Sequence, residues 1–283
     1  MNIRIVRNKI KSVGNVKKIT KAMQLVSAVK MKKAVNAALE GRPYQEILEE
    51  MIARLGRKID SSLSPLLHEQ ENSQSTELII LVSTNKGLCG AFNGNLFRYL
   101  MGNMQLKNCD TIAIGKKGAQ FASHATHAVT ADFSQEHPDD AVSAVIGLAV
   151  NGFLEGTYKK VHIAYNQFIS TFRTEPTVET LLPVAPNIQE VTDENKSQYV
   201  VEPAPEVLIG ELLRSYIEEK LRYVLIQTEA GEHATRMVAM KNATDNANDL
   251  IYNLTLERNK LRQQKITYEL LDMITAKESV EQN

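Results

Sequence analysis

Residues 240–271 read MKNATDNANDLIYNLTLERNKLRQQKITYELL, and this stretch decides the fold. It contains a line of positions separated alternately by three and four residues, the spacing of a coiled-coil contact line. Eight of the ten positions are apolar, alanine or tyrosine: Met240, Ala243, Ala247, Leu250, Leu254, Glu257, Leu261, Gln264, Tyr268 and Leu271. No proline follows Pro205, so we expect one helix from about residue 206 to 276. Such a helix would be on the order of 105 Å long, too long to be buried in a compact domain of this size.

The other end of the chain predicts a second long helix. Its apolar positions are spaced by three or four residues with one irregularity: Ile3, Val6, Ile10, Val13, Val16, Ile19, Met23 and Val26. The pattern resumes beyond Pro43, so we expect a helix from residue 3 to about 57, roughly 80 Å long, with a kink at Pro43. Zipping the two helices antiparallel would bury both apolar lines. The alternative is a pair of ordinary helices broken at Gly41 and Gly231.

The middle of the chain alternates strand and helix patterns. Strands are expected at 77–82, 111–114, 128–133 and 160–168, with helices at 93–101, 118–123 and 139–154 and a hairpin at 169–182. Alternation of this kind indicates a mainly parallel sheet. The predicted fold class is therefore α/β, with a long antiparallel coiled coil of the N- and C-terminal helices and a central α/β, Rossmann-like domain. We divide the chain into an N-terminal coiled-coil helix (1–57), a central α/β domain (76–200) and a C-terminal coiled-coil helix (206–283).

Composition excludes several classes of protein. The 283 residues are 43% hydrophobic and 23% charged, which is typical of an ordered chain. The longest apolar stretches, 78–82 and 144–150, are far shorter than the ~20 residues that span a bilayer. Residues 1–11 carry charge where a signal peptide needs an apolar region. The two cysteines, Cys89 and Cys109, form no zinc or redox motif, which fits a reducing compartment.

The neutral net charge conceals a basic segment. Residues 1–33 contain ten Lys and Arg residues and no acid, so the remaining 250 residues must sum to −10. Seven of the ten lie within roughly 60° of one direction on a helix, which gives a basic stripe. A stripe of this kind is either a solvated face or a surface for an acidic protein, nucleic acid or anionic lipid.

No constellation of residues predicts an active site. The loop from Ser83 to Ala91 follows a buried strand, where α/β folds place their sites, but no phosphate-binding G-x-x-x-x-G-K-[ST] motif is present. Gly115-Lys116-Lys117-Gly118 is better explained as a turn between strand and helix. Cys89 has no histidine near it in sequence to act as a base, and the six histidines form no metal-binding motif. We therefore expect no catalytic residues, no cofactor and no metal.

Three blocks carry a resemblance to a known family. They are KIKSVGNVKKITKAMQLVSAVKMKK at 9–33, TNKGLCGAFNGNLF at 84–97 and EHATRMVAMKNATDNANDLIYNLTLERNKLRQQKITYELL at 232–271. In sequence, order and spacing these blocks resemble the gamma subunit of the F-type ATP synthase. The middle block departs slightly, because Asn85 and Lys86 stand where the family usually has an acid and an arginine, and Ala91 replaces a common glycine.

The resemblance implies a rotor shaft that couples ion-driven rotation of a membrane ring of c subunits to sequential conformational change of the catalytic beta subunits. The implied partners are the alpha and beta subunits of the catalytic hexamer, the epsilon subunit and the c-ring, with no nucleic acid and no direct insertion into the membrane. The chain itself would be a non-catalytic subunit. The partner-binding residues implied by the match are Lys21, Met23, Lys30, Lys32, Lys33, Arg236, Arg262, Gln263 and Thr267.

Three other interpretations remain open from the residues. One is a nucleic-acid-binding protein with a basic N-terminal helix, although no aromatic residue is interleaved with the stripe before Tyr44. The others are an α/β enzyme with coiled-coil extensions and a coiled-coil scaffold with no rotary role. The sequence shows no obvious transit peptide, so we expect a bacterial chain at the cytoplasmic face of the plasma membrane, held there as a peripheral part of the complex; the alternative is a processed organellar chain, which would look similar.

Overall fold

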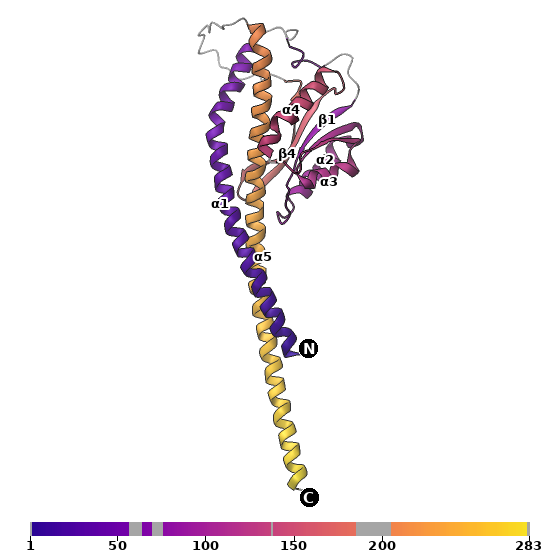
Figure 1. The fold of residues 1–283 in the computed structure, drawn as a ribbon. Helices are drawn as coiled ribbons and strands as arrows, with labels where there is room; N and C mark the ends of the chain where they lie inside the picture. The colour runs from indigo at the N-terminus through magenta and orange to yellow at the C-terminus, as the bar shows by residue number, and fades with distance from the viewer. Residues whose placement is uncertain (1, 57–63, 70–75, 137, 185–204, 282–283) are drawn as a thin grey trace. The chain divides into compact units, whose positions relative to one another are not determined.

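The structure, a computed structural model, describes residues 2–56, 64–69, 76–136, 138–184 and 205–281 (Figure 1). Its helices are α1 (Ile3–Gly56), α2 (Phe92–Asn103), α3 (Lys116–Ala125), α4 (Pro138–Leu154) and α5 (Pro205–Glu281), with a short 3-10 helix at Leu106–Asn108. Its strands are β1 (Glu77–Val82), β2 (Cys109–Ile114), β3 (Ala128–Asp132), β4 (Val161–Ser170) and β5 (Arg173–Leu182). The predicted fold class is confirmed, since long N- and C-terminal helices flank a central mixed sheet.

Both long helices are continuous. α1 runs through Gly41 and Pro43, and α5 runs through Gly231, so the alternative of helices broken at the two glycines is wrong. Gly231 has a packing role instead, because a Cβ there would lie 3.1 Å from side-chain atoms of both Phe92 and Thr174. Glycine lets α2 and β5 approach α5 closely, which offsets its low helix propensity.

The chain divides into two compact units. Residues 1–27 and 236–283 form what we call the coiled-coil unit, and residues 28–235 form the α/β unit. Each unit takes part of α1 and part of α5. The three-part division at residues 57, 76, 200 and 206 stays a prediction, and residues 57 and 200 lie outside the described residues.

The sheet of the α/β unit has the order β3-β2-β1-β4-β5. The first four strands in this order are parallel, and β5 pairs antiparallel with β4. The predicted hairpin exists, but its first strand is β4 itself, which continues to Ser170 before β5 begins at Arg173. The sequence pattern misplaced the turn because both strands stay half polar near it.

Two apolar layers sandwich the sheet. α4, the α5 segment from Ile209 to Leu225 and Ile52 of α1 cover one face, while α2 and α3 cover the other. β1 lies at the centre and is buried at five of its six positions. Burial on both faces explains why ELIILV is apolar throughout rather than alternating. The sheet is therefore a fully covered core on which α5 is one of the covering helices.

Candidate partner interface

α1 and α5 pack antiparallel in the coiled-coil unit. The hydroxyls of Thr20 and Thr244 lie 2.8 Å apart, while Asn2 and Ile3 share a groove with Leu261 and residues after it. Moving back along α1 thus means moving forward along α5, as an antiparallel pair requires. The buried and half-buried contact line of α1 is Ile3, Val6, Ile10, Val13, Lys17, Thr20, Gln24 and Ser27.

The predicted contact line of α1 is wrong beyond Val13. In the structure the contact line continues in alternating steps of four and three residues, through Lys17, Thr20 and Ser27. The predicted apolar line has one irregularity and runs through Val16, Ile19 and Val26 instead. Thr20 and Ser27 are 8% and 3% exposed, and the regular spacing matches the twist of a two-stranded coil. Thr20 and Ser27 have small side chains, which let the two backbones approach, and the Thr20 hydroxyl lies within hydrogen-bond distance of Thr244.

The shift leaves an apolar strip on the surface of α1, which we define as Ile5, Val16, Ile19 and Val26. These four side chains are between 50% and 59% exposed and lie in an arc of roughly 80° around the helix. Met23 is half-buried in the same sector. Exposed apolar side chains gathered on one face are typical of a surface that contacts another protein.

The contact line predicted on α5 is confirmed in part. Met240, Ala247 and Leu254 are buried and Leu261 is half-buried, but Leu250 is 47% exposed because the line runs through Ile251 instead. Side chains from residue 262 to 277 are all exposed. α1 begins only at Ile3, so this last part of α5 has no length of α1 beside it past the groove at Asn2.

The expected partner-binding residues are divided between the two units. Lys21, Lys30, Lys32 and Lys33 are exposed, and only Lys21 has a described hydrogen bond of its own, to Gln24 at 3.2 Å. Lys21 and Met23 belong to the coiled-coil unit, whereas the other three lysines belong to the α/β unit. The lysine side chains are thus available at the surface in each unit.

The C-terminal residues differ in exposure. Arg262, Gln263 and Thr267 are exposed on the last part of α5, where the Thr267 hydroxyl donates to the Gln263 carbonyl oxygen at 3.0 Å. Arg236, in contrast, is only 6% exposed. Arg236 therefore differs from the other eight in being buried within the described chain.

Polar groups of the loop from Ser83 to Ala91 bind the start of α3. Ser83 Oγ accepts from Gly118 N at 2.6 Å, Asn85 Oδ1 accepts from Lys116 N at 3.0 Å, and the Thr84 carbonyl accepts from Lys117 N at 3.1 Å. The N–H groups at the start of α3 that could hold a phosphate are thus occupied by this loop. Cys89 is 3% exposed and lies 3.7 Å from the Asn93 amide nitrogen, as expected for a packed residue.

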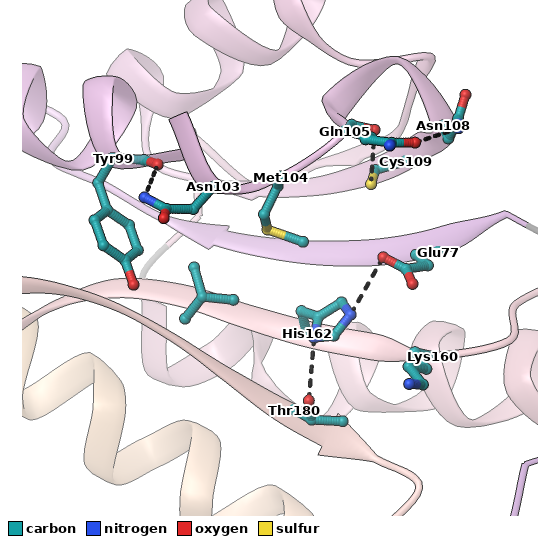
Figure 2. Close-up of a pocket in the computed structure, with 11 residues that line it drawn as sticks. Glu77, Tyr99, Asn103, Met104, Gln105, Asn108, Cys109, Lys160, His162 and Thr180 are labelled. Carbon is teal, nitrogen blue, oxygen red and sulfur yellow. Dashed lines mark hydrogen bonds and ion pairs between the residues drawn. The ribbon is translucent and has the colours of Figure 1, made fainter. Parts of the chain in front are cut away.

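A hollow of about 500 Å³ lies at the amino ends of β1, β2 and β4 (Figure 2). His162 lies between Glu77, 3.4 Å from Nε2, and Thr180, 3.3 Å from Nδ1. Burial lowers the pKa of His162, against the opposing effect of Glu77. Burial also raises the pKa of the Cys109 thiol to about 11, so this sulfur is a poor nucleophile near neutral pH. Cys109 is therefore not an activated nucleophile in this hollow.

The described residues offer neither a metal centre nor a membrane span. No cluster of three or more metal-ligating side chains is found among them. None of their helices has a stretch apolar and long enough to cross a membrane.

Comparison with known proteins connects these features to one family. A family model described as ATP synthase matches residues 2–280. The ATP synthase gamma chain of Opitutus terrae is 37% identical, with 96% of this chain and 97% of the relative covered. That of Akkermansia muciniphila is 35% identical, with 99% of each chain covered.

Solved structures give the same fold. A chain in the Euglena gracilis mitochondrial ATP synthase, in a structure of its OSCP/F1/c-ring, has a TM-score of 0.67 at 19% identity, covering 98% of this chain and 94% of that chain. A chain from the central stalk and c-ring of the Tetrahymena thermophila mitochondrial enzyme has a TM-score of 0.56 at 21% identity, covering 80% and 99%. None of these relatives favours the nucleic-acid or scaffold interpretations. Similarity along almost the whole length, to relatives well above 30% identity, shows that the chain belongs to the ATP synthase gamma chain family.

Proposed function

We propose that this chain is the central rotor shaft of an F-type ATP synthase. It couples ion-driven rotation of the c-ring to sequential conformational change of the catalytic beta subunits, and it carries no active site of its own. The observation that supports this most strongly is the coiled-coil unit, whose two helices are zipped along a regular contact line while an apolar strip faces outward.

The partners are the alpha and beta subunits of the catalytic hexamer, the epsilon subunit and the c-ring. A shaft with one apolar strip is not threefold symmetric, so three surrounding beta subunits meet different surfaces at any moment. A contact that favours one conformation of a beta subunit shifts its population toward that conformation. No chemistry on the shaft is needed.

The strip is large enough for this task. Burying one methylene group contributes about 0.8 kcal/mol, so each half-exposed branched side chain can contribute on the order of 1 kcal/mol to an interface with a beta subunit. Since 1.4 kcal/mol changes an equilibrium tenfold, burying or exposing two or three of these side chains would change nucleotide affinity by about a hundredfold.

The surface that meets the hexamer includes Lys21, Met23, Lys30, Lys32, Lys33, Arg262, Gln263 and Thr267. The four lysines attract acidic segments of the catalytic subunits, and Met23 packs beside the apolar strip. Arg236 is buried, so it can contact the hexamer only if a partner side chain enters the packed region around it. The three-part division of the chain belongs to the same proposal. So does a location at the cytoplasmic face of a bacterial plasma membrane, which the bacterial relatives support.

Reconstitution tests the function directly. The purified chain should hydrolyse no ATP alone and should confer hydrolysis when mixed with cognate alpha and beta subunits. Hydrolysis by the isolated chain, or a hexamer equally active without it, would contradict the proposal.

The basic residues have their own test. Replacing Lys30, Lys32 and Lys33 together by alanine should lower ATP-driven ion pumping while leaving the thermal unfolding temperature of the chain almost unchanged, because exposed charges contribute little to stability. A matched control is the replacement of three other exposed lysines, Lys107, Lys116 and Lys117, by alanine. Equal pumping in the two variants would show that Lys30, Lys32 and Lys33 do not belong to the interface.

A further inference from the structure

Three polar side chains connect α5 to the sheet of the α/β unit. Tyr165 lies on β4, Glu179 on β5 and Lys220 on α5. The Tyr165 hydroxyl donates to Glu179 Oε1 at 2.5 Å, and Lys220 Nζ lies 2.8 Å from Glu179 Oε2. One carboxylate therefore holds the sheet with one oxygen and the helix with the other. We refer to these three residues as the Glu179 bridge.

The bridge lies at the margin of the larger apolar core. Tyr165 is 2% exposed, while the side chains of Lys220 and Glu179 are 21% and 30% exposed. Ile217 and Leu221, on either side of Lys220 along α5, are fully buried. Partial burial reduces the screening of the ion pair by water and salt, so it is stronger than a surface pair.

Contacts within the bridge favour its ionised form. Burial opposes ionisation of Glu179, but hydrogen bonds from Lys220 and Tyr165 outweigh it and hold the pKa of Glu179 below its ordinary value. Burial likewise opposes the charge on Lys220, yet the Glu179 contact raises its pKa, and Glu49 of α1 acts in the same direction. Burial and the neighbouring carboxylate raise the pKa of Tyr165, which stays a neutral donor. At neutral pH the bridge is thus a carboxylate held by an ammonium group and a phenol.

Apolar packing and the bridge constrain α5 in different ways. Hydrophobic contact is not directional, so the packing of Ile217, Leu221 and Val224 opposes movement of α5 through the fit of side chains and not through aligned polar groups. A charge-assisted hydrogen bond is directional and short. An axial shift of one residue, about 1.5 Å, would break the contact between Lys220 and Glu179.

We infer that the Glu179 bridge locks α5 to the sheet against sliding and rotation, and so passes torque between the sheet and the shaft helix. This rests on the proposed function, because it assigns the bridge a role in rotary coupling. α5 is one uninterrupted helix from Pro205 to Glu281, so a rotation fixed at Lys220 is carried along a single element. Tyr165, Glu179 and Lys220 are positioning residues, since they act through α5 rather than on a nucleotide.

The test uses the whole ATP synthase reconstituted in vesicles. Glu179→Gln removes the charge but keeps the shape of the side chain. The matched control is Glu218→Gln, which makes the same change on α5 in a looser pair with Arg214 at 3.9 Å. Two quantities are measured at equal content of assembled complex: ions pumped per ATP hydrolysed, and the torsional stiffness of the rotor from the angular fluctuations of a single-molecule probe.

We expect Glu179→Gln to increase slippage about tenfold, which corresponds to 1.4 kcal/mol less resistance to displacement of α5. Pumping per ATP and torsional stiffness should both fall, while Glu218→Gln should behave as wild type. In a double-mutant cycle with Lys220→Met, the two losses should not add, because either change breaks the same contact. Should Glu179→Gln fail to assemble, Tyr165→Phe removes only one hydroxyl and should lower stiffness to a smaller extent.

Wild-type pumping ratio and stiffness in Glu179→Gln, or in Tyr165→Phe where that variant is the one that assembles, would overturn the inference. Additive effects in the cycle would do the same. The proposed function fails in a different way, because then the wild-type complex would neither rotate nor pump. The two failures are therefore distinguishable in one set of preparations.

Discussion

The hydrogen bond between Thr20 and Thr244 gives a quantitative test of the coiled-coil unit. Thr20 Oγ1 also lies 3.1 Å from the Lys17 carbonyl oxygen, and Thr244 Oγ1 lies 2.8 Å from the Met240 carbonyl oxygen. Two hydroxyl protons cannot serve three contacts. The shorter distances indicate that Thr20 donates to Thr244 and that Thr244 donates to Met240, which forms a chain from one helix into the backbone of the other.

The two single changes to valine should therefore differ. Thr20→Val removes the donor to Thr244 and should cost about 1 kcal/mol, the usual net value of one hydrogen bond. Thr244→Val lets the Thr20 hydroxyl donate to Lys17 instead and should cost about 0.5 kcal/mol. The double variant replaces both polar groups by methyl groups of similar size and should recover most of the loss, so the coupling between the sites is about 1 kcal/mol.

Hydrogen exchange measured by mass spectrometry on the full chain reports this coupling locally. A loss of about 1 kcal/mol makes amides of the coiled-coil unit exchange about fivefold faster in Thr20→Val, provided that exchange follows unfolding of this unit. The double variant should return close to the wild-type rate. The reasoning is refuted when the effects of the two changes simply add, or when Thr20→Val exchanges at the wild-type rate.

Three further predictions concern the α/β unit. A Cβ on Gly115, whose φ is +100°, would lie 2.2 Å from the Ser83 carbonyl oxygen, so Gly115→Ala should destabilise the unit by about 3 kcal/mol or more. The control is Gly102→Ala, where nothing lies within 4 Å of the added Cβ, and it should be neutral or slightly stabilising. Thermal unfolding measures both variants. Since the pKa of Cys109 is raised to about 11, roughly one thiol in a thousand is ionised at pH 8. Iodoacetamide should therefore label Cys109 slowly until urea unfolds the chain. Rapid labelling of Cys109 in the folded chain would contradict its burial. The pKa of Glu179 is lower in the folded chain than its ordinary 4.5, so its stabilising contribution is full above pH 4.5 and is lost as the pH falls through the folded pKa. The urea midpoints of wild type and Glu179→Gln should therefore differ at pH 7 and converge in acid. A difference that stays constant with pH would count against the bridge.

Periodicity alone was enough to predict the two long helices. An apolar residue every three or four positions, with no proline in α5 beyond Pro205, leaves few structures other than a long helix pair. The parallel sheet was equally accessible, because ELIILV and the other strand patterns alternate with short helical ones. These features depend on properties that extend over many residues, so single exceptions such as Pro43 do not change the outcome.

The register of the coil was not accessible from hydrophobicity. Lys17, Thr20 and Ser27 occupy the contact line because their positions repeat regularly, and small or flexible side chains can fill an interface whose partner positions are themselves small, such as Ala247. A strict repeat of alternating three and four steps, applied without regard to residue type after Val13, would have found the line. Val16 and Ile19 give a misleading signal because exposed side chains on a helix surface can be as apolar as those of a core.

The Glu179 bridge could not be predicted from the sequence for a different reason. Its members are separated by 14 and 41 residues, and none belongs to a motif. Only the pairing of β4 with β5 and the placement of α5 over that pair bring the three side chains together. Contacts between distant segments of this kind carry no local signal in a single sequence.

The outward-facing strip on α1 has a cost for the cell. Until the remaining subunits arrive, a newly synthesised copy exposes Ile5, Val16, Ile19 and Val26 to the surrounding water, where they invite nonspecific self-association. Copies made in excess of the other subunits should therefore aggregate or be bound by chaperones and degraded by proteases. Synthesis in proportion to the other subunits avoids this. Recombinant preparations should be more soluble when produced together with them than when produced singly.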